Sequence, residues 1–151
     1  MFRSLLSIAA LALSLTVISC ASPKWQMQAG CPGIDVADAI AGLTALVTQE
    51  GMNITLVNEK IGVLQAASAE SADIWTGHLV SQSWQFTISN DTIYAFAKEI
   101  RKSRNAFGTI LSTAETYYND KVHKSHGWYW NVRNGIGAVC ENAVIMFIKK
   151  T

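Results

Sequence analysis

Three side chains able to bind a metal recur at a spacing of three, namely Asp120, His123 and His126. On a helix this spacing places them on neighbouring faces, and neutral imidazoles with a carboxylate suit zinc. Lys121 and Lys124 lie between them, so an ordinary solvated polar segment is the competing interpretation. We therefore assign no metal and keep a small metal-dependent hydrolase using these residues as an alternative function.

Other signatures of catalysis do not occur in the sequence. It contains no GxSxG nucleophile elbow and no phosphate-binding GxxxxGK[ST] loop. The Gly-x-Gly of residues 135–137 lacks the third glycine of a dinucleotide-binding loop. The sequence therefore favours a protein that is not an enzyme and has no cofactor, although eleven acidic residues leave a pair of catalytic carboxylates open.

The N-terminal segment has the pattern of an export signal. Arg3 precedes an apolar run over residues 5–18 that only Ser and Thr interrupt. A basic start followed by an apolar stretch of this length is typical of a secretory signal. The run is shorter than the roughly 20 residues that a membrane-spanning helix needs.

The end of this segment, Val17-Ile18-Ser19-Cys20, resembles the lipobox of bacterial lipoproteins. The resemblance implies a signal peptide over residues 1–19, diacylglycerol and palmitate on Cys20, and a lipidated tether over residues 20–33. Ala21, where an Asp would favour retention in the inner membrane, implies the outer membrane, with the domain facing the periplasm. An ordinary secretory signal with an incidental cysteine is the alternative.

Lipidation of Cys20 would leave one pair of cysteines, Cys31 and Cys140, in an oxidising compartment. A disulfide between them would close a long loop and stabilise the fold by about 4–5 kcal/mol in the chain-entropy description. Two free buried thiols, or a catalytic cysteine, remain the alternatives.

Length, composition and charge indicate what kind of domain the chain forms. The chain has 151 residues, half of them apolar, and a formal net charge of +1. This length and apolar content predict one packed domain, over residues 34–151. Because no run of five like charges occurs, we expect no nucleic-acid partner.

The residue pattern predicts a helix, two hairpins, an ambiguous stretch and a second helix. Asp35 is a good N-cap for the first helix, which ends before Gly51. Short strands are expected near residues 53–56 and 61–64, and longer ones at 84–89 and 92–96 around Asn90-Asp91. Residues 98–104 are expected to leave the sheet.

Two later segments are less regular. Residues 106–111 are compatible with a fifth strand, and residues 113–124 with a helix or an extended loop. An apolar stripe then predicts an amphipathic helix over residues 127–148. At its start, Trp128 is expected in the core, Trp130 partly covered, and Tyr129, Tyr117 and Tyr118 on the rim, with a ligand groove or a membrane interface as the alternatives.

Together these elements predict an α+β fold, a two-layer sandwich with about four antiparallel strands and both helices on one face. The pattern over residues 35–98 resembles small α/β modules of outer-membrane lipoproteins, including the helix-grip modules of the lipoprotein subunit of the β-barrel assembly machinery. This resemblance implies no functional residues.

We therefore expect a lipid-anchored periplasmic module for binding or envelope assembly. Its partners would be the membrane, through Cys20, and an envelope protein or an apolar ligand. A carrier of an apolar ligand held between sheet and helices is a further alternative to the metal-dependent hydrolase.

Overall fold

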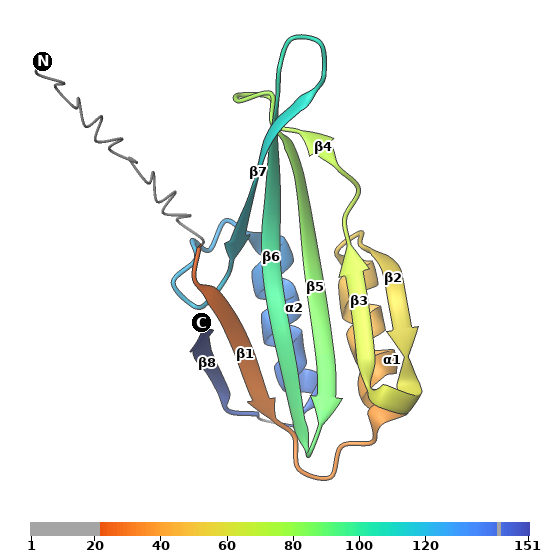
Figure 1. Cartoon of the computed structure of the whole chain (residues 1–151). Helices are drawn as coiled ribbons and strands as arrows, with labels where there is room; N and C mark the ends of the chain where they lie inside the picture. Colours follow the sequence, from red (N-terminus) through yellow and green to blue (C-terminus); the bar gives the residue numbers. More distant parts are fainter. Residues whose placement is uncertain (1–21, 142) are drawn as a thin grey trace, which may run out of the picture.

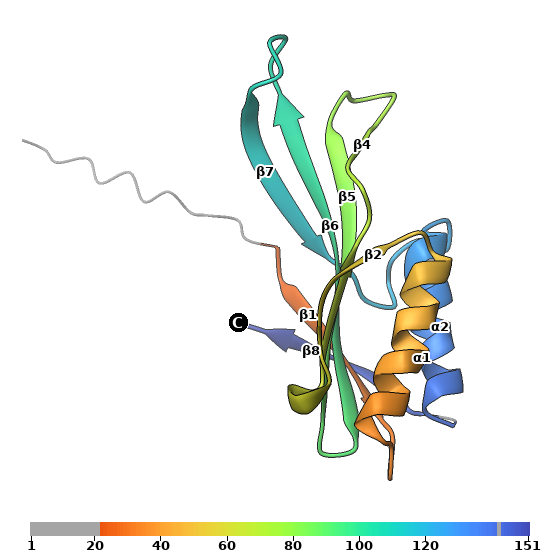
Figure 2. The ribbon, with the colours of Figure 1, turned by 90° about the vertical axis from the view of Figure 1, so that its right-hand side faces the viewer.

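The computed structural model describes residues 22–141 and 143–151. Two helices, α1 (Val36–Gln49) and α2 (Gly127–Val139), cover one face of an antiparallel sheet. Figure 1 views the sheet from the uncovered face, and Figure 2 shows both helices on the other side. The predicted α+β class, with both helices on one face of an open sheet, is confirmed.

The sheet has eight strands rather than about four. Six of them follow the order β2-β3-β5-β6-β1-β8, while β4 pairs with β5 and β7 pairs with β6. Their bounds are β1 Lys24–Gly30, β2 Asn53–Asn58, β3 Val63–Ala67, β4 Ser71–Ala72, β5 Leu79–Ser89, β6 Thr92–Arg104, β7 Ile110–Tyr117 and β8 Ile145–Lys150.

The segment expected as a tether contains a strand in the interior of the sheet. Residues 24–30 form β1, which pairs with β6 through Met27↔Ala95 and with β8 through Met27↔Phe147. Alternation in β1 buries Met27 and Ala29 under the helices, which is why this short segment is ordered as a strand.

The second helix is shorter than predicted. α2 ends at Val139, and the expected continuation to residue 148 is wrong because residues 145–150 form β8 along β1. The apolar residues at the end of the predicted helix fit the periodicity of a helix and also that of a strand. Residues 145–150 form a strand because β1 supplies backbone hydrogen-bond partners.

Residues 98–104 stay in the sheet as the second half of β6, contrary to expectation. The ambiguous stretch supplies β7 at Ile110–Tyr117, so residues 113–117 are strand and not helix. The β5–β6 hairpin is confirmed, with positive φ at both Asn90 and Asp91. β5, β6 and β7 thereby extend past the helix layer (Figure 2).

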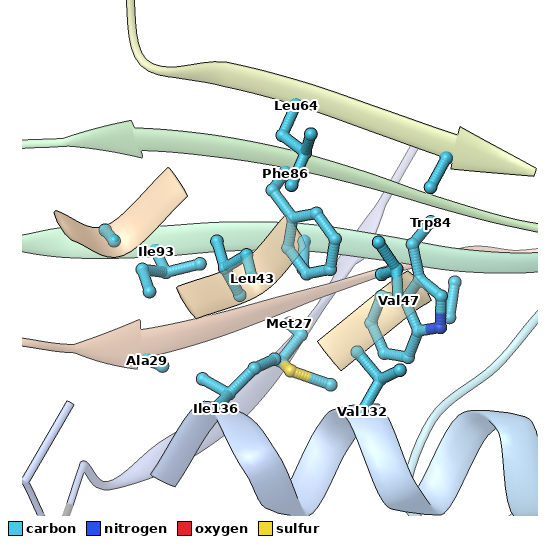
Figure 3. Packing of buried hydrophobic residues seen from close by; sticks show 14 of the residues in the cluster. Met27, Ala29, Leu43, Val47, Leu64, Trp84, Phe86, Ile93, Val132 and Ile136 are labelled. Carbon is cyan, nitrogen blue, oxygen red and sulfur yellow. The ribbon is translucent and has the colours of Figure 1, made fainter. Parts of the chain in front are cut away.

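The core lies between the sheet and the helices (Figure 3). Trp84 stacks between Phe86 and Tyr129, with ring centroids 5.3 and 5.6 Å away. The two helices approach closely at Gly135, where an added Cβ would lie 2.3 Å from Leu46 Cδ2. Gly135 therefore serves the contact between α1 and α2.

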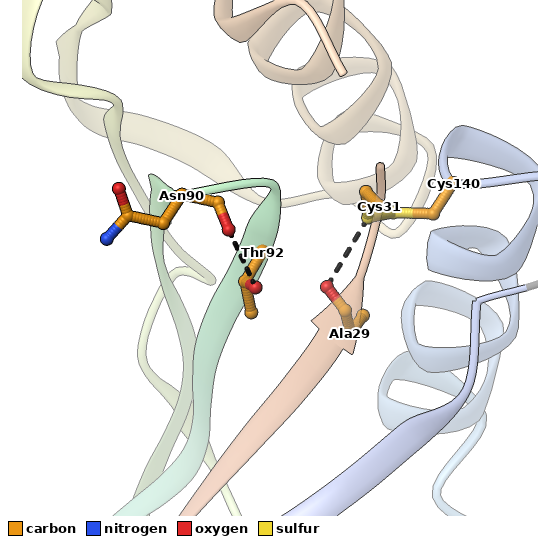
Figure 4. Close-up of a disulfide and its surroundings, with 5 residues drawn as sticks. All are labelled: Ala29, Cys31, Asn90, Thr92 and Cys140. Atoms are coloured by element: carbon orange, nitrogen blue, oxygen red, sulfur yellow. Dashed lines mark hydrogen bonds between the residues drawn. A yellow bond between two sulfur atoms is a disulfide. The ribbon is translucent and has the colours of Figure 1, made fainter. Parts of the chain in front are cut away.

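The predicted disulfide is present. Cys31 follows β1 and Cys140 caps the C-terminus of α2, with their Cα atoms 4.9 Å apart (Figure 4). Both cysteines are buried. The bond joins the helix layer to an interior strand of the sheet across a sequence separation of 109 residues.

Candidate functional site

The uncovered face of the sheet, called here the open face, carries a groove of about 420 Å³. Strands β1, β2, β3, β5, β6 and β7 all contribute to it. Its lining residues are Lys24, Thr55, Gln65, Ala66, Ala67, Ser83, Trp84, Gln85, Phe96, Lys98 and Tyr117.

Strand alternation places the polar groove residues on the open face. In β5, Trp84 and Phe86 are buried in the core, whereas Gln85 between them is exposed. The register aligns Gln85 with Gln65 of β3 on one side and with Phe96 of β6 on the other. Two amides and an aromatic ring thus lie in one row across three strands.

A second row holds the charges. Lys98 pairs in register with Ser83 of β5 and Tyr117 of β7. Its Nζ donates to Glu115 Oε1 at 2.7 Å and lies 5.9 Å from the centre of the Tyr117 ring. Tyr117 OH donates to Glu115 Oε2 at 3.2 Å, and its ring meets Phe96 edge-on at 6.0 Å.

Two pKa shifts follow from this row. The hydrogen bond from Lys98 is the main cause that lowers the pKa of Glu115, and Lys24 contributes weakly. Burial is the main cause that raises the pKa of Tyr117. With Lys24 and Lys98 in the lining and Glu115 paired to Lys98 beside it, the groove and its border carry a formal excess of one positive charge.

These groups can recognise a polar ligand with a negative charge. The glutamine amides offer both donors and acceptors, and an ammonium group offers three donors to a carboxylate or phosphate. Phe96 and Tyr117 add apolar ring surface for the body of the ligand.

A different polar cluster lies on the helix side of the sheet. Glu99 is only 6% exposed, and it accepts hydrogen bonds from Arg101 Nε at 2.6 Å and Tyr118 OH at 3.0 Å. Arg101 also lies 3.5 Å from Asp73. Burial first, and the Glu99 charge second, raise the pKa of Tyr118, so its hydroxyl stays protonated as a donor. A buried carboxylate with two donors is stabilised within the structure.

The three side chains considered as metal ligands, to which we assign no metal from the sequence, have separate partners. Asp120 receives a bidentate pair from Arg133 at 2.9 and 3.1 Å, and His123 Nδ1 lies 2.8 Å from Ser125 Oγ. His126 packs edge-on against Tyr118 at 5.2 Å. Within the described ranges, no group of three or more His, Cys, Asp or Glu side chains is placed to hold a metal ion.

The predicted placement of Tyr118 and Tyr129 on the rim is wrong, because both side chains are buried in the core. Tyr129 is fully buried, and Trp128 meets Trp84 edge-on at 6.2 Å. Burial, and secondarily Asp120, raise the pKa of Tyr129. The exposed aromatics lie elsewhere, at Trp75 and Phe107.

Cys20 lies outside the described residues, as does the predicted signal peptide. In the described part of the chain, neither helix has the length and apolar character that a bilayer crossing requires. Sequence reasoning missed the groove itself. The available signal was the polar face of β5, where Ser83, Gln85 and Thr87 alternate with aromatic and aliphatic residues.

Comparison with protein families, with curated proteins and with solved structures finds no match to this chain.

Proposed function

We propose that this chain is a lipid-anchored cell-envelope protein that binds a polar, negatively charged ligand in the open-face groove. The observation that carries the proposal is the groove itself. Its amides, aromatic rings and two lysines belong to a lining drawn from six strands, on the face of the sheet opposite α1 and α2. We propose the outer membrane as its location, with the domain in the periplasm.

The proposed anchor would hold this groove close to the bilayer. Lys24 is both the first residue of β1 and part of the groove lining. Residues 20–23, fully extended, span at most about 14 Å. A lipid on Cys20 would therefore keep the groove near the headgroups, where anionic ligands of the envelope surface are concentrated.

The lining favours a polar ligand over an apolar one. Its side chains include two glutamines, two lysines, a serine and a threonine, so an apolar ligand would leave these groups without water or hydrogen-bond partners. The layer between sheet and helices is occupied by the large side chains Trp84, Phe86 and Tyr129. The groove therefore supports binding on the sheet surface rather than carriage of a lipid between the layers.

The anchor is tested in cells that receive radiolabelled palmitate. We expect the parent chain to incorporate label and to fractionate with the outer membrane, and Cys20→Ser to lose both properties. Cys31→Ser serves as the control for replacing a cysteine elsewhere in the chain, since labelling at Cys20 does not depend on the disulfide and should persist. Equal labelling of parent and Cys20→Ser would refute lipidation at this residue.

Ligand binding is tested by a photo-crosslinking residue placed at Gln85, in the groove, or at Thr48, exposed on α1. We expect a covalent adduct in cells from position 85 only. Lys98→Ala should abolish it, because Glu115 would then leave the groove net neutral. Lys60→Ala removes an exposed lysine remote from the groove and should preserve the adduct. Equal yields of adduct from both positions, or a yield that Lys98→Ala leaves unchanged, would refute the groove as the binding site.

A further inference from the structure

Two turns at the far end of the sheet, beyond the helices, present aromatic side chains to solvent. The first, residues 73–77, connects β4 to β5, and the second, residues 105–109, connects β6 to β7. Arg104 Nη2 donates to the carbonyl oxygen of Gly77 at 3.5 Å, so the two turns are neighbours. Figure 1 shows both at the top of the sheet.

The two turns have the same local construction. Asp73 Oδ1 accepts from the backbone N–H groups of Trp75 and Thr76 at 2.9 and 3.1 Å. Asn105 Oδ1 likewise accepts from the N–H groups of Phe107 and Thr109, at 3.0 and 2.9 Å. Such side-chain bonds to the following backbone fix a turn.

Each turn also includes a glycine in the left-handed region, at Gly77 and Gly108. Both turns therefore hold an aromatic residue two positions after the capping side chain, in a defined orientation. Trp75 is 90% exposed and Phe107 is 93% exposed. These hydrogen bonds fix the backbone of each turn, so the Cα atoms of both aromatic residues are held at the far end of the sheet.

Three further apolar side chains join these aromatics in what we call the tip surface. Its residues are Ile74, Trp75, Phe107, Ile110 and Leu111, all of them exposed. An exposed group of large apolar side chains marks an interaction surface, since removing such surface from water is favourable.

Acidic groups near the tip surface are already paired. The Asp73 carboxylate holds its own turn and lies 3.5 Å from Arg101, and Glu70 is paired with Lys102. Arg104 has no acidic partner among the described residues. The tip therefore presents apolar side chains with an unneutralised cation behind them, a pattern that complements an anionic lipid surface.

We propose that the tip surface inserts into a lipid bilayer that contains anionic headgroups. A pair of protruding turns is convex, and a bilayer accommodates a convex apolar tip without needing a matching groove. Tryptophan favours the interfacial region of a membrane, where its ring is apolar and its N–H meets water. The proposal adds a second membrane contact to the proposed lipid anchor.

Chain length sets the orientation in which both contacts reach one bilayer. From Lys98, beside Lys24 in the groove, β6 continues for about 20 Å to Arg104. The proposed anchor allows Lys24 to stand at most about 14 Å from the bilayer. The long strands must then lie obliquely to the membrane rather than upright.

The test uses the chain from residue 20 with Cys20→Ser, so that no lipid is attached and failure of the anchor cannot affect the result. This chain keeps the whole core and the disulfide, which lie within residues 24–147. The probe is a vesicle of phosphatidylcholine and phosphatidylglycerol, and flotation measures partitioning. We expect measurable partitioning that falls by about tenfold or more in Trp75→Ser/Phe107→Ser.

Matched controls are Ile61→Ser and Val144→Ser, which are 63% and 74% exposed and lie outside the tip surface. They should leave partitioning unchanged. Quenching of tryptophan emission by brominated acyl chains should fall in Trp75→Phe, which keeps the apolar surface but removes the inserted fluorophore. No partitioning of the parent chain, equal loss in the controls, or quenching indifferent to Trp75 would each overturn the proposal.

Discussion

Gly62 is a position where a single added methyl group would meet both a strained backbone conformation and a backbone contact. It closes the short helix η1 (Glu59–Ile61) with φ +64° and ψ 41°, in the left-handed region. A Cβ there would lie 2.4 Å from the carbonyl oxygen of Ile88. That backbone cannot easily move away, because Ile88 N–H donates to the Gly62 carbonyl at 2.8 Å and β5 is paired on both sides.

Gly62→Ala therefore combines two costs. The left-handed backbone costs a residue with a side chain about 1–2 kcal/mol, and forced overpacking costs about 1–3 kcal/mol more. We expect the free energy of unfolding, measured by urea denaturation followed by circular dichroism, to fall by about 2–5 kcal/mol. The variant should also loosen the register between β3 and β5.

Gly51→Ala is the matched control. Gly51 follows α1 with φ +74°, and a Cβ there would meet no atom within 4 Å. Gly51→Ala should lower the free energy of unfolding only by the cost of a left-handed backbone, about 1–2 kcal/mol. If the two variants lost equal stability, the contact with Ile88 would contribute nothing and the argument for a rigid β3–β5 junction would fail.

Two further substitutions test a disulfide and a buried hydrogen bond that stabilise the fold. Replacing Cys31 and Cys140 together by serine should lower the free energy of unfolding by about 4–5 kcal/mol, since the disulfide closes a loop of more than 100 residues. Urea melts with and without reductant measure this, and reductant should affect only the parent chain. Tyr118→Phe should cost about 1–3 kcal/mol, because Glu99 stays buried and loses one of its two donors. Tyr94→Phe, on the open face, should be nearly neutral in the same melt, and equal losses would contradict the role assigned to the Glu99 contact.

The start of α1 and the β5–β6 hairpin were predicted correctly, because each depends on residues that are close together in the sequence. Asp35 caps α1 by accepting from the N–H groups of Ala37 and Asp38, as its position in the sequence indicated. The turn at Asn90-Asp91 requires positive φ at both positions, which these residues tolerate, and the hairpin around it is present. In both places the residues that decide the structure are neighbours in the chain.

Pairing over long distances determined the elements that were mispredicted. β1 and β8 are near opposite ends of the chain and pair with one another, and no window of sequence contains both. The sequence of residues 24–30, taken by itself, predicts a tether, and that of residues 145–148 predicts the end of a helix. Each becomes a strand because the other supplies backbone partners, which is information that periodicity does not hold.

The same reasoning applies to the candidate site. Gln65, Gln85 and Lys98 are ordinary surface residues in sequence, and only the register of β3, β5 and β6 brings them into one groove. The two turns of the tip surface could have been predicted from the sequence. Asp73 and Asn105 each precede an aromatic residue by two positions, and a glycine follows in both turns. Asp120, His123 and His126 show the converse, because regular spacing in sequence does not bring their side chains together in the structure.

The position of β1 also changes what an anchor would do. A long flexible tether would let the domain search a wide volume and raise its effective concentration near many envelope components. With residues 24–30 built into the sheet, only a few residues separate Cys20 from the folded domain. The groove would then sample a thin layer next to the bilayer, so its ligand must be one that reaches the membrane surface. If Cys20 carries the proposed lipid, the short connection would favour a ligand or partner at the headgroup level over one far from the membrane.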